Sequence, residues 1–152
     1  MTAMMPPEDC KAYRDLFKDA MIKASSSMGI QIKDIDLTVK KIWHSVWNRH
    51  MQAWLIYRKG IVIGLVLTKV IRDDFLDYNE LLVYCLYIIE GFSMSLEEWD
   101  QCYNKLSEFG YEMGCRWITA YTTVERVRRM TSRMGGTIDT TYIRIPIQRT
   151  KP

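Results

Sequence analysis

The sequence has no hydrophobic run long enough to cross a membrane. Its longest apolar run, from Leu81 to Ile89, is far shorter than the roughly 20 residues that a spanning helix needs. The N-terminal segment also lacks a basic start followed by an apolar stretch, because Met1 to Pro7 is followed by Glu8 and Asp9. These absences predict a chain with no membrane span and no secretory signal, which folds in a reducing cytoplasm.

Residues that usually hold metals or attack substrates are few and scattered. The only histidines, His44 and His50, lie six positions apart, about 120° from alignment on a helix, and no carboxylate pair beside them completes a metal site. No serine lies in a nucleophile-elbow motif. The four cysteines form no CxxC pair, which favours reduced and buried thiols. They are Cys10, Cys85, Cys102 and Cys115. We therefore predict no metal site and no hydrolase triad.

The chain does contain enough apolar material for one core. Its 152 residues (18.0 kDa) are 48% hydrophobic, which is ordinary for a globular protein and argues against disorder. The net charge of +3, from 21 basic and 18 acidic residues, is too mild to imply a nucleic-acid partner by itself. Because there is no internal repeat and no low-complexity linker, we predict a single domain over residues 1–152.

The first half of the chain predicts two helices and a hairpin. Apolar side chains at helical spacing indicate an amphipathic helix over residues 8–28, which Gly29 ends. A second helix is predicted over about 36–52, with Asp36 as its N-cap. Residues 53–58 and 61–70 are rich in β-forming side chains, and Lys59-Gly60 between them is a good hairpin turn.

The second half alternates strands and helices. After a polar loop over 72–79, the strand Leu81 to Ile89 is apolar on both faces, which suits a central strand covered on both sides. Ser95 and Glu98 form a capping box at the start of the next helix, and Gly114 supplies its left-handed end. A strand over 116–121, a short helix over 124–134 ended by Gly135-Gly136, and a last strand over 137–147 follow. Pro146 makes an edge position the expected place for that last strand.

This order of elements predicts the fold class. The hairpin requires antiparallel pairing, whereas the strand–helix–strand unit in the middle implies a right-handed crossover and a parallel pair. We therefore predict an α/β fold with a mixed, mostly antiparallel central sheet and helices on both faces.

The same order, over about residues 8–147, resembles the GCN5-related N-acetyltransferase fold. The best local match is the helix and turn from Val124 to Ile138, which are similar to the turn before the last strand of that fold. The resemblance implies acetyl transfer from acetyl-coenzyme A. The chain departs from it in three places. Gly91 to Ser95 lacks the basic residue and second glycine of the pyrophosphate loop, Thr122-Thr123 replaces an asparagine, and the helix 124–134 lacks the tyrosine acid.

These departures suit a narrower resemblance, to the small internal virion protein of T7-like short-tailed phages, carried by the segment Glu98 to Ile138. It implies a non-catalytic structural component of a phage particle, without a cofactor, located in the virion interior and made in the bacterial host cytoplasm. Its expected partners are other virion or assembly proteins. The surplus of Trp and Met side chains favours an oligomer.

The alternative is a divergent N-acetyltransferase that uses acetyl-coenzyme A. A helix N-terminus attracts anions, so the backbone of the junction before the capped helix would hold the pyrophosphate. The residues of that junction are Gly91, Phe92, Ser93, Met94 and Ser95. Glu80 and Glu90 flank the strand before it, and either is a candidate general base or an exposed strand-end carboxylate. In the structural interpretation, Phe92 and Met94 are instead packing groups.

One cluster of charge stands out, on the helix 124–134. Arg126, Arg129 and Arg133 share a helical face, with Arg128 beside them. Three interpretations remain open at this point. The arginines contact phosphates of a coenzyme or of packaged nucleic acid, they contact acidic patches on a neighbouring subunit, or they form a solvated helix face.

Overall fold

Residues 1–75, 77–122 and 125–138 are described here in a computed structural model. The chain divides into two compact units, Met1–Ala120 and Tyr121–Pro152, which are treated separately below. Of the elements in the described residues, the first unit holds all the strands and most of the helices, and the second holds one helix, α4 (Glu125–Arg133). That one domain extends over residues 1–152 stays a prediction.

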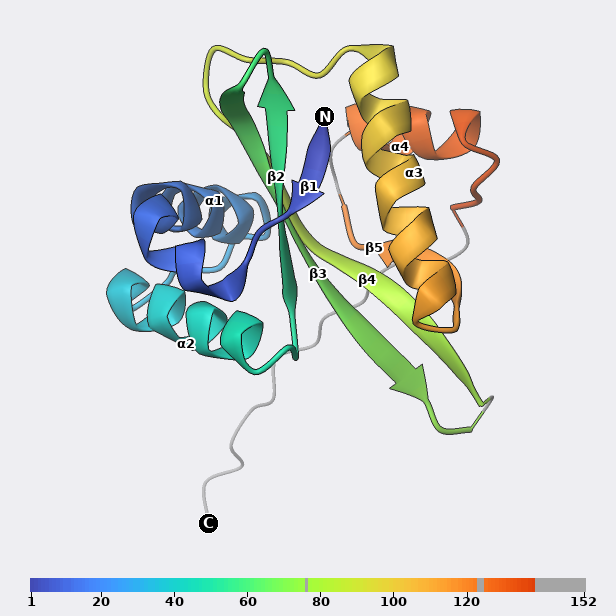
Figure 1. The fold of residues 1–152 in the computed structure, drawn as a ribbon, viewed down its shortest axis with the longest axis horizontal. Coiled ribbons are helices and arrows are strands. Elements are labelled where there is room, and N and C mark those ends of the chain that lie inside the picture. Colours follow the sequence, from blue (N-terminus) through green and yellow to red (C-terminus); the bar gives the residue numbers. More distant parts are fainter. Residues whose placement is uncertain (76, 123–124, 139–152) are drawn as a thin grey trace. The chain divides into compact units, whose positions relative to one another are not determined.

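A five-stranded mixed sheet confirms the predicted α/β fold (Figure 1). The strands are β1 (Thr2–Met4), β2 (Gln52–Arg58), β3 (Ile61–Asp73), β4 (Tyr78–Ile88) and β5 (Cys115–Ala120), in the spatial order β1-β2-β3-β4-β5. Neighbours pair antiparallel except β4 and β5, which are parallel. Both the hairpin and the parallel pair expected from the sequence are therefore confirmed.

Helices cover both faces of the sheet, as predicted. The 3₁₀ helix η1 (Pro7–Tyr13), α1 (Arg14–Ser27) and α2 (Ile35–Trp47) lie on one face, and α3 (Leu96–Glu112) lies on the other (Figure 1). Each face has its own apolar core. Phe17, Leu55 and Leu67 belong to the core under α1 and α2, whereas Ile63 and Leu106 belong to the core under α3.

The predicted bounds of the first two helices are wrong at their ends. The segment 8–28 starts as the 3₁₀ helix η1, and α1 begins only at Arg14. The N-cap of α2 is Asp34, whose Oδ1 accepts the Leu37 N–H at 2.9 Å, while the Asp36 carboxylate instead pairs with Arg14. Helix α2 ends at Trp47 rather than near residue 52, because Arg49 adopts a left-handed φ of 59°.

Two parts of the sheet were not predicted. The strand β1 has three residues, too few for a sequence pattern, and forms because it pairs with β2 from Thr2↔Ile56 to Met4↔Trp54. Half of the predicted loop 72–79 instead belongs to β3 and β4, which pair as far as Asp73↔Tyr78. Its polar composition reflects exposure rather than the absence of a strand, since Arg72 and Asp74 are exposed.

The prediction that Leu81 to Ile89 forms a central strand covered on both faces is confirmed only in part. The strand β4 is interior and its side chains reach both cores, but the middle strand is β3, and β4 lies next to β5, the last strand among the described residues. In β4 only Leu81 and Cys85 are buried, while Tyr84 is 53% exposed. Apolar side chains of β4 still pack into both cores, because a β-bulge within the strand changes which face the following side chains point to.

The bulge falls at Tyr84. Leu67 of β3 pairs with Cys85, but the next residue, Thr68, pairs with Val83, so Tyr84 has no partner in the β3 register. Before the bulge, Val83 belongs to the α3 side, whereas Cys85 after it belongs to the side of α1 and α2. One extra residue thus lets odd-numbered side chains serve first one core and then the other.

The remaining helix boundaries are those expected. The capping box of Ser95 and Glu98 is present in full, and Gly114 follows α3 with a φ of 67°. The helix α4 corresponds to the predicted segment 124–134, and Gly135 after it has a φ of 76°. The predicted last strand, 137–147, lies outside the described residues from position 139 onward, and residues 137–138 have no regular structure.

Candidate functional site

The parallel strands β4 and β5 run side by side over only half of β4. Their pairing extends from Asn79↔Cys115 to Val83↔Ala120. The strand β4 then continues for five more residues, 84–88, with β3 on one side and no strand among the described residues on the other. Unpaired backbone N–H and C=O groups on such an edge can hold an extended ligand by adding it as a strand.

This open edge of β4 leads directly to the N-terminus of α3. The connection turns at Gly91, whose φ is 86°, and Phe92 N–H donates to Ile89 O at 3.0 Å. Met94 is only 2% exposed and packs in the core under α3, whereas Phe92 is 40% exposed. Met94 is therefore a packing group, as one interpretation expected, whereas Phe92, expected to be another, is exposed and belongs to neither core.

Two N–H groups at the start of α3 are available to a ligand. The capping box uses the other two, because Ser95 N–H donates to Glu98 Oε2 at 2.7 Å and Glu98 N–H donates to Ser95 Oγ at 3.2 Å. No described residue accepts a hydrogen bond from the N–H of Leu96 or Glu97. These groups, aided by the helix dipole, can bind one anion.

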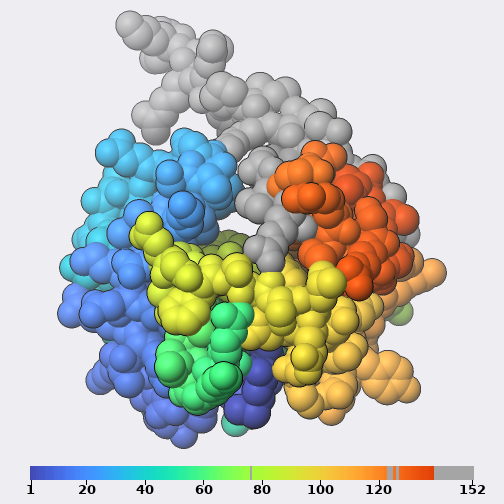
Figure 2. Space-filling model, turned by 90° about the horizontal axis from the view of Figure 1, so that it is seen from above, coloured from blue at the N-terminus to red at the C-terminus, as the bar shows by residue number. Residues whose placement is uncertain are grey.

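A cation reaches this loop from a distant part of the sequence. Arg58, the last residue of β2, donates from Nε and Nη2 to the Glu98 carboxylate at 2.7 and 2.6 Å, and from Nη2 to Ser93 O at 2.5 Å. In Figure 2 the β2–β3 turn and the start of α3 meet on the same surface, in agreement with these bonds. A basic residue from β2 thus contacts the loop Gly91 to Ser95, but it is paired with Glu98 and holds the loop in place.

The Arg58–Glu98 pair fixes the charges at this helix terminus. Hydrogen bonds from Arg58, followed by the backbone N–H of Ser95, lower the pKa of Glu98 to about 2. The same pair raises the pKa of Arg58. Glu98 thus stays ionised and cancels the charge of Arg58, so an anion here is held mainly by backbone N–H groups. The open strand edge followed by two free N–H groups fits a coenzyme with an extended arm and a pyrophosphate.

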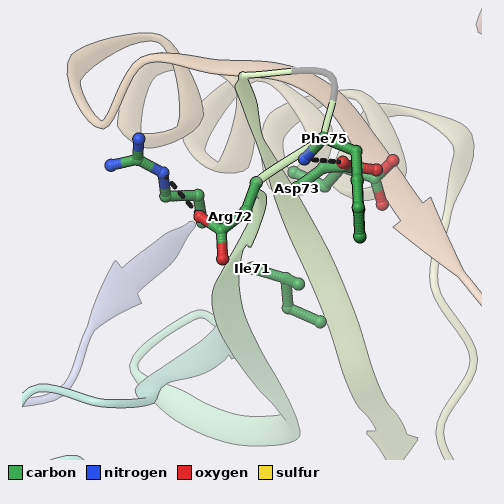
Figure 3. Close-up of a pocket in the computed structure, with 6 residues that line it drawn as sticks. Ile71, Arg72, Asp73 and Phe75 are labelled. Carbon is green, nitrogen blue, oxygen red and sulfur yellow. Dashed lines mark hydrogen bonds and ion pairs between the residues drawn. The ribbon is translucent and has the colours of Figure 1, made fainter.

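Glu80, one of the two predicted candidate bases, is held on β4 by two hydroxyl groups. Its carboxylate accepts from Tyr78 OH at 3.2 Å and from Thr119 Oγ1 of β5 at 3.3 Å. Burial and then the hydrogen bond to Glu80 raise the pKa of Tyr78. The carboxylate borders a hollow of about 330 Å³ at the β3–β4 turn, called here the Glu80 hollow (Figure 3). Its other lining residues are Ile71, Arg72, Asp73, Asp74 and Phe75.

Glu90 lies at the opposite end of the strand. It is exposed and comes two residues after β4 ends at Ile88. Ten residues of extended chain correspond to about 33 Å, so the structure does not bring Glu80 and Glu90 together. Only one of them can act at a given reaction centre.

The predicted arginine cluster lies on α4, in the second unit. Arg128, Arg129 and Arg133 are exposed, and Arg128 forms an ion pair with Glu125 at 3.7 Å. The side chain of Arg126 lies outside the described part of the structure. A contact of these arginines with phosphates or with a partner stays a prediction.

The histidines, cysteines and carboxylates of the described residues form no metal centre. Within ranges 1–75, 77–122 and 125–138, no group of three His, Cys, Asp or Glu side chains could hold a metal ion, and no helix is long and apolar enough to cross a membrane. The four cysteines are free thiols. Cys10, Cys85 and Cys102 are buried, and Cys115 is half-buried.

Comparison with known proteins identifies the fold. No protein-family model and no curated protein sequence matches the chain. Among solved structures, it is similar to AAC(6')-Iy in complex with the bisubstrate analogue CoA-S-monomethyl-acetylneamine (14% identity, 97% of each chain, TM-score 0.74). It is also similar to a predicted acetyltransferase with acetyl-CoA from Clostridium acetobutylicum (11%, 96% of this chain and 95% of that one, 0.73). It is similar as well to an aminoglycoside acetyltransferase from an uncultured soil metagenomic sample (15% identity, 97% of this chain and 98% of that one, TM-score 0.71). The chain therefore has the acetyltransferase fold.

These comparisons correct one expectation. The chain was predicted to be a non-catalytic structural component of a phage particle, and this is wrong, because the similar structures are acetyltransferases, some with acetyl-CoA or CoA bound. None of these comparisons supports the resemblance to a phage virion protein. They favour the alternative drawn from the same sequence.

Proposed function

We propose that the protein is a divergent N-acetyltransferase that uses acetyl-coenzyme A. The observation that carries this proposal is the separation of β5 from β4 after Val83↔Ala120, which leaves a strand edge that leads to a helix N-terminus. Acetyltransferases of the same fold have been solved with acetyl-CoA or CoA bound, which supports the proposal.

In this proposal the chain holds the coenzyme mostly through its backbone. The edge of β4 at residues 84–88 binds the extended arm, and the N–H groups of Leu96 and Glu97 bind the pyrophosphate. Arg58 keeps the loop in place through Ser93 O and Glu98. When bound, the coenzyme supplies an acetyl thioester, and the chain orients it toward the acceptor amine.

The distance of each carboxylate from the point where β5 separates from β4 indicates which of them is the general base. The separation point at Val83 is three residues, or about 10 Å, from Glu80, but seven residues, or about 23 Å, from Glu90. We therefore assign Glu80 as the group that takes the proton from the acceptor amine. Its two hydroxyl donors, Tyr78 and Thr119, orient the carboxylate. Tyr84, exposed and one residue past Val83, is the hydroxyl we assign to protonate the leaving sulfur.

A proline substitution tests the coenzyme site without removing the helix. Leu96 is the first helical residue, where proline is well tolerated, and Ser95 before it has a ψ of 167°, which a following proline permits. Leu96→Pro removes one of the two free N–H groups, whereas the control Leu96→Ala keeps it. Isothermal titration calorimetry with acetyl-coenzyme A should show at least tenfold weaker binding for Leu96→Pro alone. Equal affinities for the two variants, or no binding by the unmodified chain, would refute the proposed site.

Substitution of the carboxylates tests the catalytic assignment separately. Glu80→Gln should lower kcat for acetyl transfer by about 10²- to 10⁴-fold, the usual contribution of a general base, and leave the affinity for acetyl-coenzyme A unchanged. The control Glu90→Gln should change neither quantity. The assay is release of free coenzyme A thiol with a panel of amines. A larger loss for Glu90→Gln than for Glu80→Gln would overturn the assignment.

A further inference from the structure

A second hollow, of about 450 Å³, lies at the end of α2 in the first unit and is called here the basic hollow. Its lining residues come from the last turns of α2, from the α2–β2 connection and the first residue of β2, from β3 where it extends past β2, and from the C-cap of α3. They are Ser45, Arg49, His50, Met51, Gln52, Lys69, Val70 and Met113. Because α3 has 17 residues, its two ends are about 25 Å apart, so this hollow is separate from the proposed coenzyme site at Leu96.

The charge of the basic hollow is of one sign. Arg49, His50 and Lys69 line it, and no acidic side chain among the described residues does. Neither Arg49 nor Lys69 forms an ion pair with a described residue, whereas Arg14, Arg58, Arg72 and Lys105 all do. Cations that converge on a concave surface concentrate their field there, so the hollow attracts anions.

The backbone at Arg49 is in a conformation that its side chain disfavours. Its φ of 59° is in the left-handed region, where a helix usually ends on glycine, and α2 ends immediately before it at the C-cap Asn48. A non-glycine residue here carries conformational strain. Such strain is found at ligand clamps, where the side chain is used. The arginine in place of glycine puts a guanidinium at the rim of the basic hollow.

We propose that the basic hollow binds a small molecule with two or more negative charges, phosphoryl or carboxylate. Its volume lies in the range of ordinary ligand pockets. Beside it, β3 residues 69–73 lie past the last β2 pair, Gln52↔Thr68, so the backbone edge adds hydrogen-bonding groups to the two cations and the His50 ring. The site is independent of the proposed acetyl transfer.

The test uses the full chain and two probes, inorganic pyrophosphate and citrate, each titrated at low salt. The readout is the ring NMR signals of His50, which report on the basic hollow itself, with the ring of His44 as the internal control. A shift of the His50 signals alone is the expected result. Stronger binding of pyrophosphate identifies phosphoryl ligands, and stronger binding of citrate identifies carboxylates. Absence of any His50 shift up to about 10 mM of both probes would overturn the proposal.

A matched pair of variants distinguishes the effect of charge in the basic hollow from the effect of relieving backbone strain. Arg49→Gly and Lys59→Gly each remove one positive charge and relieve a left-handed residue, since Lys59 has a φ of 50° in the β2–β3 turn. Both should raise Tm, by about 2 to 4 °C. Only Arg49→Gly should weaken probe binding, tenfold or more, and Lys69→Met should do the same without the gain in Tm. Equal weakening by Arg49→Gly and Lys59→Gly would show a general charge effect and refute the proposal.

Discussion

Gly64 is a position in the sheet with little room for a side chain. It lies in β3 between Ile56 of β2 and Ile88 of β4. A Cβ atom added to it would be 2.7 Å from Tyr87 O, 2.8 Å from Ile88 Cδ1 and 3.3 Å from Ile56 Cδ1. The isoleucine methyl groups can rotate away, but the Tyr87 carbonyl is backbone and belongs to β4, the strand proposed to hold the coenzyme.

The size of the effect follows from that carbonyl. Relief of a 2.7 Å contact between carbon and oxygen requires a backbone shift of about half an ångström between β3 and β4, so Gly64→Ala falls at the upper end of overpacking costs, about 3 kcal/mol. For a chain of this length, Tm should fall by about 6 to 12 °C. The open half of β4 should lose order first, because β3 is its one strand neighbour among the described residues.

Gly110 provides the matched control. It lies inside α3, and a Cβ there would meet its nearest neighbour, Leu81 Cδ2, at 3.6 Å, an ordinary contact. Gly110→Ala should therefore stabilise the chain by about 0.5 to 1 kcal/mol, since alanine restricts the unfolded chain and favours the helix. Equilibrium urea unfolding followed by tryptophan fluorescence measures both variants. A Gly64→Ala protein as stable as the unmodified chain would refute the packing argument.

Three further predictions concern stability and thiol reactivity. Because the pKa of Glu98 is lowered from 4.5 to about 2, its ionised form stabilises the fold above pH 4.5, and this contribution is lost as the pH falls toward 2. Glu98→Gln should lower the free energy of unfolding in urea by about 1 to 2 kcal/mol at pH 7. Between pH 4.5 and 2 the free energy of unfolding of this variant should depend less on pH than that of the unmodified chain. Thr68→Val should lower the free energy of unfolding in urea by about 1 to 3 kcal/mol, because the buried Trp54 Nε1–H, which donates to Thr68 Oγ1 at 2.9 Å, would lose its acceptor. An unchanged free energy of unfolding would contradict that role. Burial raises the pKa of Cys85 to about 12, so iodoacetamide labelling measured by mass spectrometry at pH 8 should proceed only as fast as the chain unfolds, and rapid native labelling would show an accessible thiol.

Local signals predicted most of the element order. The capping box at Ser95, the Lys59-Gly60 turn and the glycine at 114 depend on residues within a few positions of each other, and all three are confirmed. The two-sided apolar sequence of β4 predicted a central strand, which is confirmed only in part, because the middle strand is β3. The side chains of β4 do serve both cores, but through the bulge at Tyr84, which a period of two cannot reveal.

The candidate site was predicted only in part. The strand–loop–helix junction at Gly91 to Ser95 and the carboxylate Glu80 were identified from the sequence, and whether they act in catalysis stays a prediction. The cation at that junction was missed, because Arg58 and Glu98 are 40 positions apart and no motif joins them. The basic hollow was missed for the same reason, since Arg49, Lys69 and Met113 come from three separate segments.

The sequence by itself determined the order and type of most helices and strands and the capped ends of α3, because caps, turns and side-chain periodicity act over a few residues. The tertiary structure alone decided that β3 is central, that β5 leaves β4 after Val83, and that Arg58 contacts the start of α3. These features depend on strand register and on contacts between distant segments, whose free energy comes from burial and pairing in the assembled sheet. The basic residue that the tertiary structure brings to the loop Gly91 to Ser95 is therefore a structural partner of Glu98 and Ser93, which no local pattern of the sequence could predict.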